Sequence, residues 1–157
     1  MEKIVEVTNQ LIIDYRARTW CTLPYYGHPK GCPNYNKSPK CPPQVERVED
    51  YFDLSQKHWF AIVDFDLGAH KQKLKKLHPN WTEHQLKCVL YWQGSVRKRL
   101  KELCESFLFD GVVYNTIPEA MGVHVINTMQ KLGFDIQRQV TKKVYKVALI
   151  GYKKEIV

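Results

Sequence analysis

The sequence predicts one α+β domain over residues 1–157, an α/β sandwich with helices packed on a mixed sheet and a metal-binding loop near its N-terminus. Three observations support this fold class. Short apolar runs of β-forming residues alternate with longer segments of helical periodicity. With 44% hydrophobic residues, the chain can bury a core of ordinary size. Three of the five cysteines and six of the eight prolines crowd into residues 21–43.

The first half of the chain yields a strand, the loop, a short helix and a second strand. Residues 3–7 alternate apolar and charged side chains, which predicts a short strand. The loop ends at Pro42-Pro43, and the apolar residues of 45–52 then recur at helical spacing. Residues 59–65 form a compact run of aromatic and β-branched residues, which is typical of a buried strand.

The middle of the chain is predicted to be helical on both sides of a break at His78-Pro79-Asn80-Trp81. Thr82 and Gln85 have the spacing of a capping box, which marks a helix start. Apolar residues continue at helical spacing to Phe107, so we expect one long helix over about 82–107, with Gly94 as its weak point.

The last third of the chain predicts a strand, a helix and a hairpin. Residues 111–114 form the strand, and Pro118 fits the first turn of a helix that ends at Gly133. Residues 136–140 and 144–152 then pair as a closing hairpin. This element order suits an α/β sandwich of one domain, and a ferredoxin-like topology is among the arrangements it allows.

The loop over residues 21–43 is too rich in proline to be a helix or a central strand, because proline lacks the N–H donor and has a fixed φ. It also carries little aliphatic surface, so another element must hold it. We find no secretory leader and no apolar stretch long enough to span a membrane, and therefore expect a soluble, cytoplasmic protein. A reducing compartment and an odd cysteine count favour metal binding over disulfides.

The candidate ligands are Cys21, Cys32 and Cys41, separated by ten and eight residues. Thiolates select zinc, Cu(I) or iron–sulfur clusters, and this spacing alone does not name the metal. Three thiolates suit a [4Fe–4S] cluster with one open iron, and the prolines after Cys32 and Cys41 resemble those of ferredoxin ligands. They also suit zinc completed by His28, while Cys88 is a further candidate for the fourth position.

Three short motifs in and near the loop resemble those of a known family. They are Arg18-Thr-Trp-Cys21, Gly31-Cys32-Pro-Asn-Tyr35 and Lys40-Cys41-Pro-Pro43. Farther on, Pro118-Glu-Ala120-Met-Gly122-Val-His124 completes the pattern. The chain resembles, over about residues 15–136, the predicted metal-binding proteins of domain-of-unknown-function family 2284. The resemblance implies a metal site on the three loop cysteines.

One part of the family pattern is missing. The family carries a second, ferredoxin-like cysteine group before the Pro-Glu-Ala segment, where this chain has only Cys104 and the stretch 105–110. His124 also stands where the family prefers Asp. The resemblance therefore implies one metal site in this chain and argues against a relay of several redox centres.

The formal charge of +8 is compatible with an anionic partner such as RNA, DNA or a nucleotide. Basic residues concentrate at 71–76 and 97–101, both on predicted helices, and they would form a phosphate-binding patch if the two faces coincide. Tyr25, Tyr26 and Tyr35 lie around the cysteines, where they could stack on bases. An alternative function is thus a nucleic-acid-binding module stapled by zinc. No substrate or reaction follows from the sequence.

Overall fold

The computed structural model describes residues 2–23, 29–33, 35–37, 39–88, 92–134 and 143–155, with the backbone alone at residues 20 and 21. Four strands form one sheet: β1 (Glu2–Glu6), β2 (His58–Asp66), β3 (Val112–Asn115) and β4 (Lys143–Tyr152). Their order is β1-β2-β4-β3, and each neighbouring pair is antiparallel. The α+β class is therefore confirmed, although the sheet is antiparallel rather than mixed.

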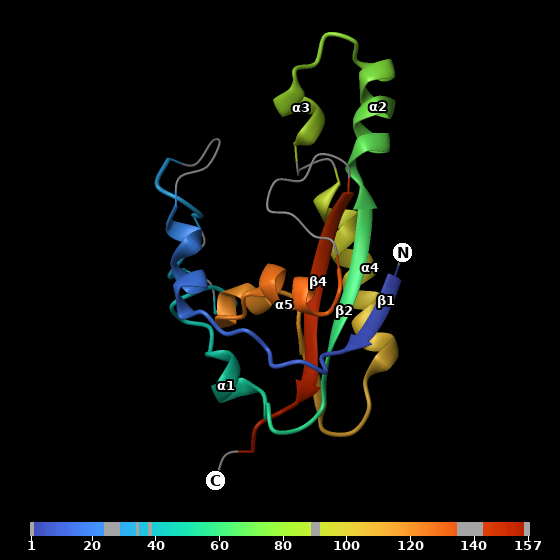
Figure 1. Ribbon diagram of the computed structural model, residues 1–157. Coiled ribbons are helices and arrows are strands. Elements are labelled where there is room, and N and C mark those ends of the chain that lie inside the picture. Colours follow the sequence, from blue (N-terminus) through green and yellow to red (C-terminus); the bar gives the residue numbers. More distant parts are fainter. Residues whose placement is uncertain are drawn as a thin grey trace.

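Helices cover both faces of the sheet (Figure 1). One face packs against α4 (Gln93–Phe107), whose Val96, Leu100 and Cys104 are fully buried. The other face packs against η3 (Pro118–Met121), α5 (Val125–Lys131) and α1 (Val48–Tyr51). Because both faces are covered, residues 60–63 of β2 are all fully buried, with alternate side chains in opposite core layers.

Strands β2 and β3 are parallel to one another, since both pair antiparallel with β4, which lies between them. With α4 as their connection they form a split β-α-β unit, a component of ferredoxin-like folds. The remaining edge strand, β1, comes from the N-terminus. A full ferredoxin-like topology stays a prediction, and the expected hairpin partner at 136–140 lies outside the described residues.

The expectation of one long helix over 82–107 is wrong, because two separate helices form there. Helix α3 (Glu83–Lys87) begins with the predicted capping box of Thr82 and Gln85 but ends at Cys88, whose ψ of 121° is extended. Helix α4 starts only after Trp92, whose ring stacks on Phe65 of β2 with centroids 4.9 Å apart. α4 is thus held on the sheet, whereas α3 packs on α2 (Leu67–Leu77), which continues β2 beyond the sheet (Figure 1).

The helix expected from Pro118 to Gly133 is also broken, at Gly122. This residue has a φ of +105°, which ends η3, and α5 begins three residues later. The backbone of residues 122–124 instead pairs with residues 12–14: Asp14 N–H donates to Gly122 O at 2.8 Å, and His124 N–H donates to Ile12 O at 2.8 Å. Tertiary pairing therefore overrides the helical periodicity here.

Candidate functional site

The first cysteine of the loop lies near the end of a short 3-10 helix. This helix, η1 (Tyr15–Thr22), packs against η3 on the side of the sheet that carries α5. Its C-terminal half is tied by hydroxyl groups: Thr19 Oγ1 donates to Arg16 O at 2.7 Å, and Thr22 Oγ1 donates to Thr19 O at 2.6 Å. The backbone of Cys21 belongs to this helix, while its side chain lies outside the described part of the chain.

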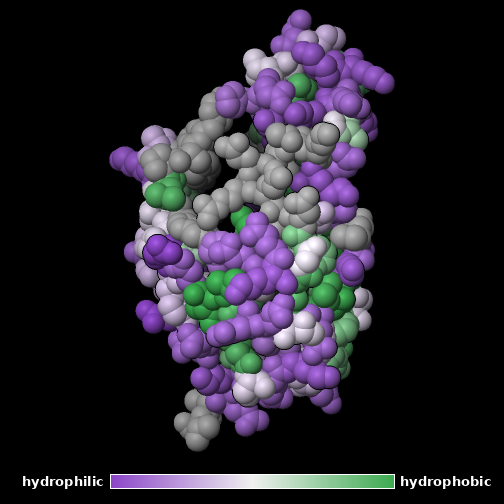
Figure 2. Space-filling model, in the orientation of Figure 1, coloured by the Kyte–Doolittle hydropathy of each residue, from purple (hydrophilic) through white to green (hydrophobic). Residues whose placement is uncertain are grey.

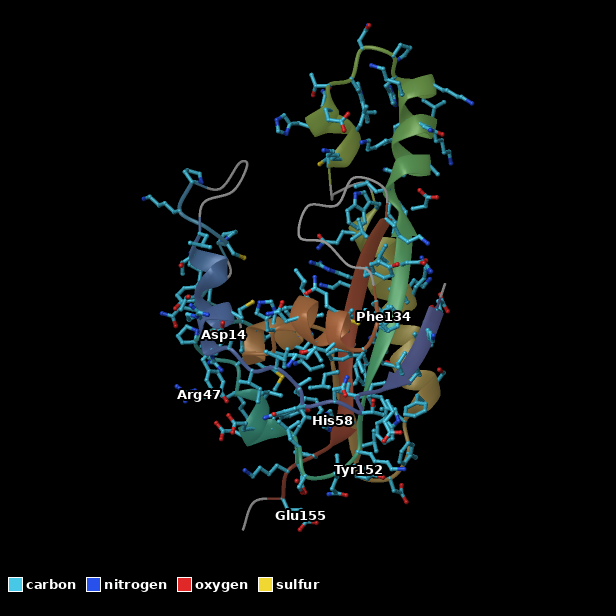
Figure 3. All side chains as sticks on the ribbon, viewed as in Figure 1. Asp14, Arg47, His58, Phe134, Tyr152 and Glu155 are labelled. Atoms are coloured by element: carbon cyan, nitrogen blue, oxygen red, sulfur yellow. The ribbon has the colours of Figure 1, made fainter. Side chains whose placement is uncertain are left out.

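Tyr15 anchors the start of η1 to two other elements. Its hydroxyl donates a hydrogen bond to Glu49 of α1, and the Arg47 guanidinium lies 4.7 Å from the centre of its ring. On another side the ring approaches the backbone of Gly122 closely. Figure 3 labels Arg47 on the α1 side, below η1. These contacts fix where the cysteine loop leaves the core.

Arg18 connects η1 to the far end of the loop. Its Nη2 donates to Pro43 O at 3.1 Å and to Val45 O at 2.8 Å, and Val45 N–H donates to Cys41 O at 3.0 Å. The second terminal nitrogen, Nη1, is buried and has no hydrogen-bond partner among the described residues. The segment that carries Cys41 is therefore held against the helix that carries Cys21.

A second set of hydrogen bonds connects the middle of the loop to the same segment. Tyr35 N–H donates to Cys32 O at 3.2 Å, which closes a turn. Asn36 N–H donates to Pro42 O at 2.7 Å, and Gln44 Nε2 donates to Asn36 O at 2.7 Å. The turn that follows Cys32 thus lies beside the residues that follow Cys41.

A pocket of about 460 Å³ opens beside Cys32. Its lining combines Thr22, which directly follows Cys21, with residues from the turn around Cys32. The lining residues are Thr22, Pro29, Lys30, Gly31, Cys32, Pro33, Tyr35 and Lys37. The chain thus brings Thr22, the residue next to Cys21, to the same pocket as Cys32.

The predicted ligands are placed as follows. Cys32 and Cys41 are free, half-buried thiols on the same loop. The side chain of Cys21 and all of His28 lie outside the described residues. Within the described ranges no three His, Cys, Asp or Glu side chains form a group that could hold a metal ion. The three-cysteine site therefore remains a prediction.

The other cysteines are separate from the loop in sequence and element. Cys88 is half-buried at the C-terminal cap of α3, beyond the sheet. Cys104 is fully buried in the core under α4, where burial raises the pKa of its thiol to about 12. Cys104 is thus a core residue, as its apolar neighbours predict.

The loop region has an unbalanced charge. Residues 15–45 contain five basic side chains and no Asp or Glu. Of these, Arg16 is paired with Asp14 at 2.7 Å, and Arg18 is bound to carbonyl groups. The remaining three are lysines at positions 30, 37 and 40, which all line pockets. A cationic loop favours anionic groups, including metal-bound thiolates.

The two basic stretches of the sequence lie on different parts of the fold. The stretch 71–76 lies on α2, which with α3 forms a hairpin that projects beyond the sheet and is covered with hydrophilic residues (Figures 1 and 2). Within it, Lys71 pairs with Glu83 at 2.6 Å. The stretch 97–101 lies on α4, where Arg99 binds Glu2 at 3.0 Å. Of these basic residues, Lys101 lines a pocket that also includes Lys40 of the cysteine loop.

Sequence reasoning missed the environments of three residues. The sequence reading assigned no role to Glu119, yet burial raises the pKa of its carboxyl above the ordinary value, with Lys146 as the opposing charge. His124 is buried and caps α5, with its Nδ1 accepting from Asn127 N–H at 3.2 Å. His58, at the lower end of the sheet in Figure 3, has a buried Nε2 for which the described part of the chain offers no hydrogen-bond partner. Only the tertiary fold reveals these environments.

Fold and loop together define an α+β protein whose cysteine- and lysine-rich loop is anchored on the helical layer of one sheet face. No protein-family model, curated protein or solved structure matches the chain. The resemblance to domain-of-unknown-function family 2284 thus stays a prediction from the motifs. Among the described residues, no helix is both long and apolar enough to cross a membrane.

Proposed function

We propose that the protein carries one metal centre, a [4Fe–4S] cluster held by Cys21, Cys32 and Cys41. The observation that carries the proposal is the mutual anchoring of the three cysteine-bearing segments. Arg18 ties η1 to Pro43 and Val45, and Asn36 ties the turn after Cys32 to Pro42. These hydrogen bonds hold together the segments that carry three soft ligands, which are separated in the sequence by ten and eight intervening residues, and this supports the proposal.

The chemistry of the donor set supports the same proposal. Cys32 and Cys41 are free thiols that are half-buried rather than packed in the core. The lysines of the pocket beside Cys32, Lys30 and Lys37, would offset the negative charge of the bound thiolates. An iron with an open coordination position supplies Lewis-acid chemistry or binds a sulfur ligand. A reducing compartment such as the cytoplasm is part of this proposal.

The test is anaerobic purification followed by iron and acid-labile sulfide analysis. We expect a coloured protein with about four irons per chain, as the cluster type requires. Cys32→Ala and Cys41→Ala should each lose most of the iron. Cys104→Ala is the matched control, because it removes a thiol from the core and should keep the iron. A colourless protein with stoichiometric zinc would overturn the cluster.

Zinc is the alternative occupant, and two further variants examine the fourth position. In a zinc site completed by His28, His28→Ala should loosen the metal, whereas a three-cysteine cluster should be mostly retained. Cys88→Ala tests the second candidate for the fourth position: if Cys88 is the fourth ligand, this variant should loosen the metal. Zinc lost in His28→Ala would favour the zinc-stapled, nucleic-acid-binding alternative.

A further inference from the structure

Two pockets share the cysteine loop as a wall. The first is the pocket of about 460 Å³ beside Cys32, which includes Lys30 and Lys37. The second has a volume of about 330 Å³ and joins Lys40 of the loop to Lys101 of α4 and to the end of β3. Its remaining lining residues are Tyr114, Asn115, Thr116 and Ile117. The loop therefore contributes residues to two pockets.

Both pockets have the same charge character. Among the described residues, each pocket is lined by two lysines and neither lining contains an acidic residue. Lys101 is well exposed and has a long ion pair, 4.0 Å, with Glu105. Lys37 and Lys40 are three residues apart, so their Cα atoms are separated by at most about 11 Å. Lys37 of the first pocket and Lys40 of the second are thus close to one another along the loop.

Each pocket also contains one tyrosine. Tyr35 lines the first pocket and Tyr114 lines the second. Asn115 adds a side-chain amide to the second pocket, and its Oδ1 is already engaged by Ile117 N–H at 2.7 Å, which leaves the amide nitrogen as the available donor. Lysines spaced along a groove with interleaved aromatic rings are the usual means of binding single-stranded nucleic acid.

We infer that a single strand of nucleic acid binds across the cysteine loop, with phosphates on the lysine pairs and bases against Tyr35 and Tyr114. The inference extends the proposed function by naming the substrate class of the same loop, so that a bound strand would pass beside the metal centre. Binding itself requires only the two pockets, which permits an independent test.

The test is fluorescence anisotropy with a labelled oligouridylate of roughly 12 nucleotides, within the range of known site sizes. Lys30→Glu/Lys101→Glu reverses one charge in each pocket. Lys57→Glu/Lys98→Glu is the matched control, since it makes the same charge change at exposed lysines outside both pockets. We expect the pocket variant to weaken binding at least about tenfold and to reduce the salt slope by about 1.4 for two phosphate contacts.

Equal losses in the two double variants would overturn the inference, because net charge alone would then explain binding. So would tighter binding to anionic phospholipid vesicles than to the oligonucleotide, or no saturable binding at all. Tyr35→Leu should weaken binding roughly tenfold while Tyr35→Phe keeps it, since phenylalanine preserves stacking. Equal affinity of Tyr35→Leu and Tyr35→Phe would count against a stacked base.

Metal analysis of the same samples separates this inference from the proposed function. A protein with full iron that binds no oligonucleotide would sink the nucleic-acid site and leave the cluster standing. A protein without iron that binds the oligonucleotide through Lys30 and Lys101 would overturn the cluster and leave the nucleic-acid site standing.

Discussion

The ring of Tyr15 occupies the space where a side chain at residue 122 would lie. A Cβ built on Gly122 would be 2.5 Å from Tyr15 Cδ1, far inside van der Waals contact, and Gly122 has a φ of +105°. Both the close approach and the backbone conformation require glycine here. This contact joins the helix that carries Cys21 to the segment between η3 and α5.

Gly122→Ala should therefore destabilise the protein strongly. We expect the free energy of unfolding to fall by at least about 2 kcal/mol, because the substitution combines left-handed backbone strain with a clash. Gly94→Ala in α4 is the control, since a Cβ there has nothing within 4 Å. That change should be neutral or stabilise by up to about 1 kcal/mol. Urea unfolding of both variants measures the difference, and equal stabilities would contradict the argument.

The Tyr15 hydroxyl should lose its proton at a higher pH than an ordinary tyrosine. Burial, followed by the hydrogen bond to Glu49, raises its pKa from 10.0 to about 12. A raised tyrosine pKa means that the neutral form is favoured in the folded state. Its contribution to stability is complete below pH 10 and is lost as the pH rises through about 12. Near-ultraviolet absorbance titration of wild type against Tyr15→Phe should reveal this late phenol, and Glu49→Gln should lower its pKa.

Glu119 should make the fold more stable at acid than at neutral pH. Burial raises the pKa of its carboxyl above 4.5, with Lys146 opposing the shift. The protonated form is thus favoured in the folded state, and this stability is present below pH 4.5 and lost as the pH rises through the folded-state pKa. Glu119→Gln should raise the thermal midpoint at neutral pH and change it little below pH 4. A uniform effect across pH would refute the assignment.

The cysteines should differ sharply in reactivity. Cys32 and Cys41 are half-buried, whereas Cys104 is fully buried with a pKa raised to about 12. Metal-free native protein should be alkylated at the two loop cysteines long before Cys104, because the thiolate is the reactive form. Mass spectrometry after timed iodoacetamide treatment gives the order. Metal loading should then protect the three proposed ligands, Cys21, Cys32 and Cys41, and leave the reactivity of Cys104 unchanged; protection of none of the three would count against the loop as the metal site.

The sequence predicted the positions of the described strands well, the sheet type wrongly as mixed, and the helix boundaries poorly. The run at 59–65 is β2 and the stretch 144–152 is most of β4, because apolar β-forming residues in a sheet covered on both faces leave a strong local signal. The predicted helices are interrupted at Cys88 and at Gly122. In both places a distant contact decides the structure: Trp92 on Phe65, and residues 122–124 on 12–14. Periodicity contains no information about such contacts.

The candidate site likewise has features that the sequence reveals and features that only the fold reveals. Residue type and loop composition were enough to single out Cys32 and Cys41, since thiols in a proline-rich loop are visible in the sequence. The role of Arg18, however, depends on its hydrogen bonds to the carbonyl groups of Pro43 and Val45. Lys40 and Lys101 line one pocket because the loop lies near the end of β3. These relationships are long-range and emerge only from the fold.

Strands β1 and β2 are antiparallel neighbours, and their pairing begins at Glu6 and Trp59. The chain between them, residues 7 to 57, therefore leaves and re-enters the sheet at the same point, like a greatly enlarged hairpin turn. Closing a loop of this length in place of a four-residue turn costs about 2 kcal/mol of chain entropy. A metal bound to Cys21, Cys32 and Cys41 would cross-link residues 21 to 41 within this stretch and shorten the chain that has to be closed, so loading it would favour the pairing of the N-terminal edge strand.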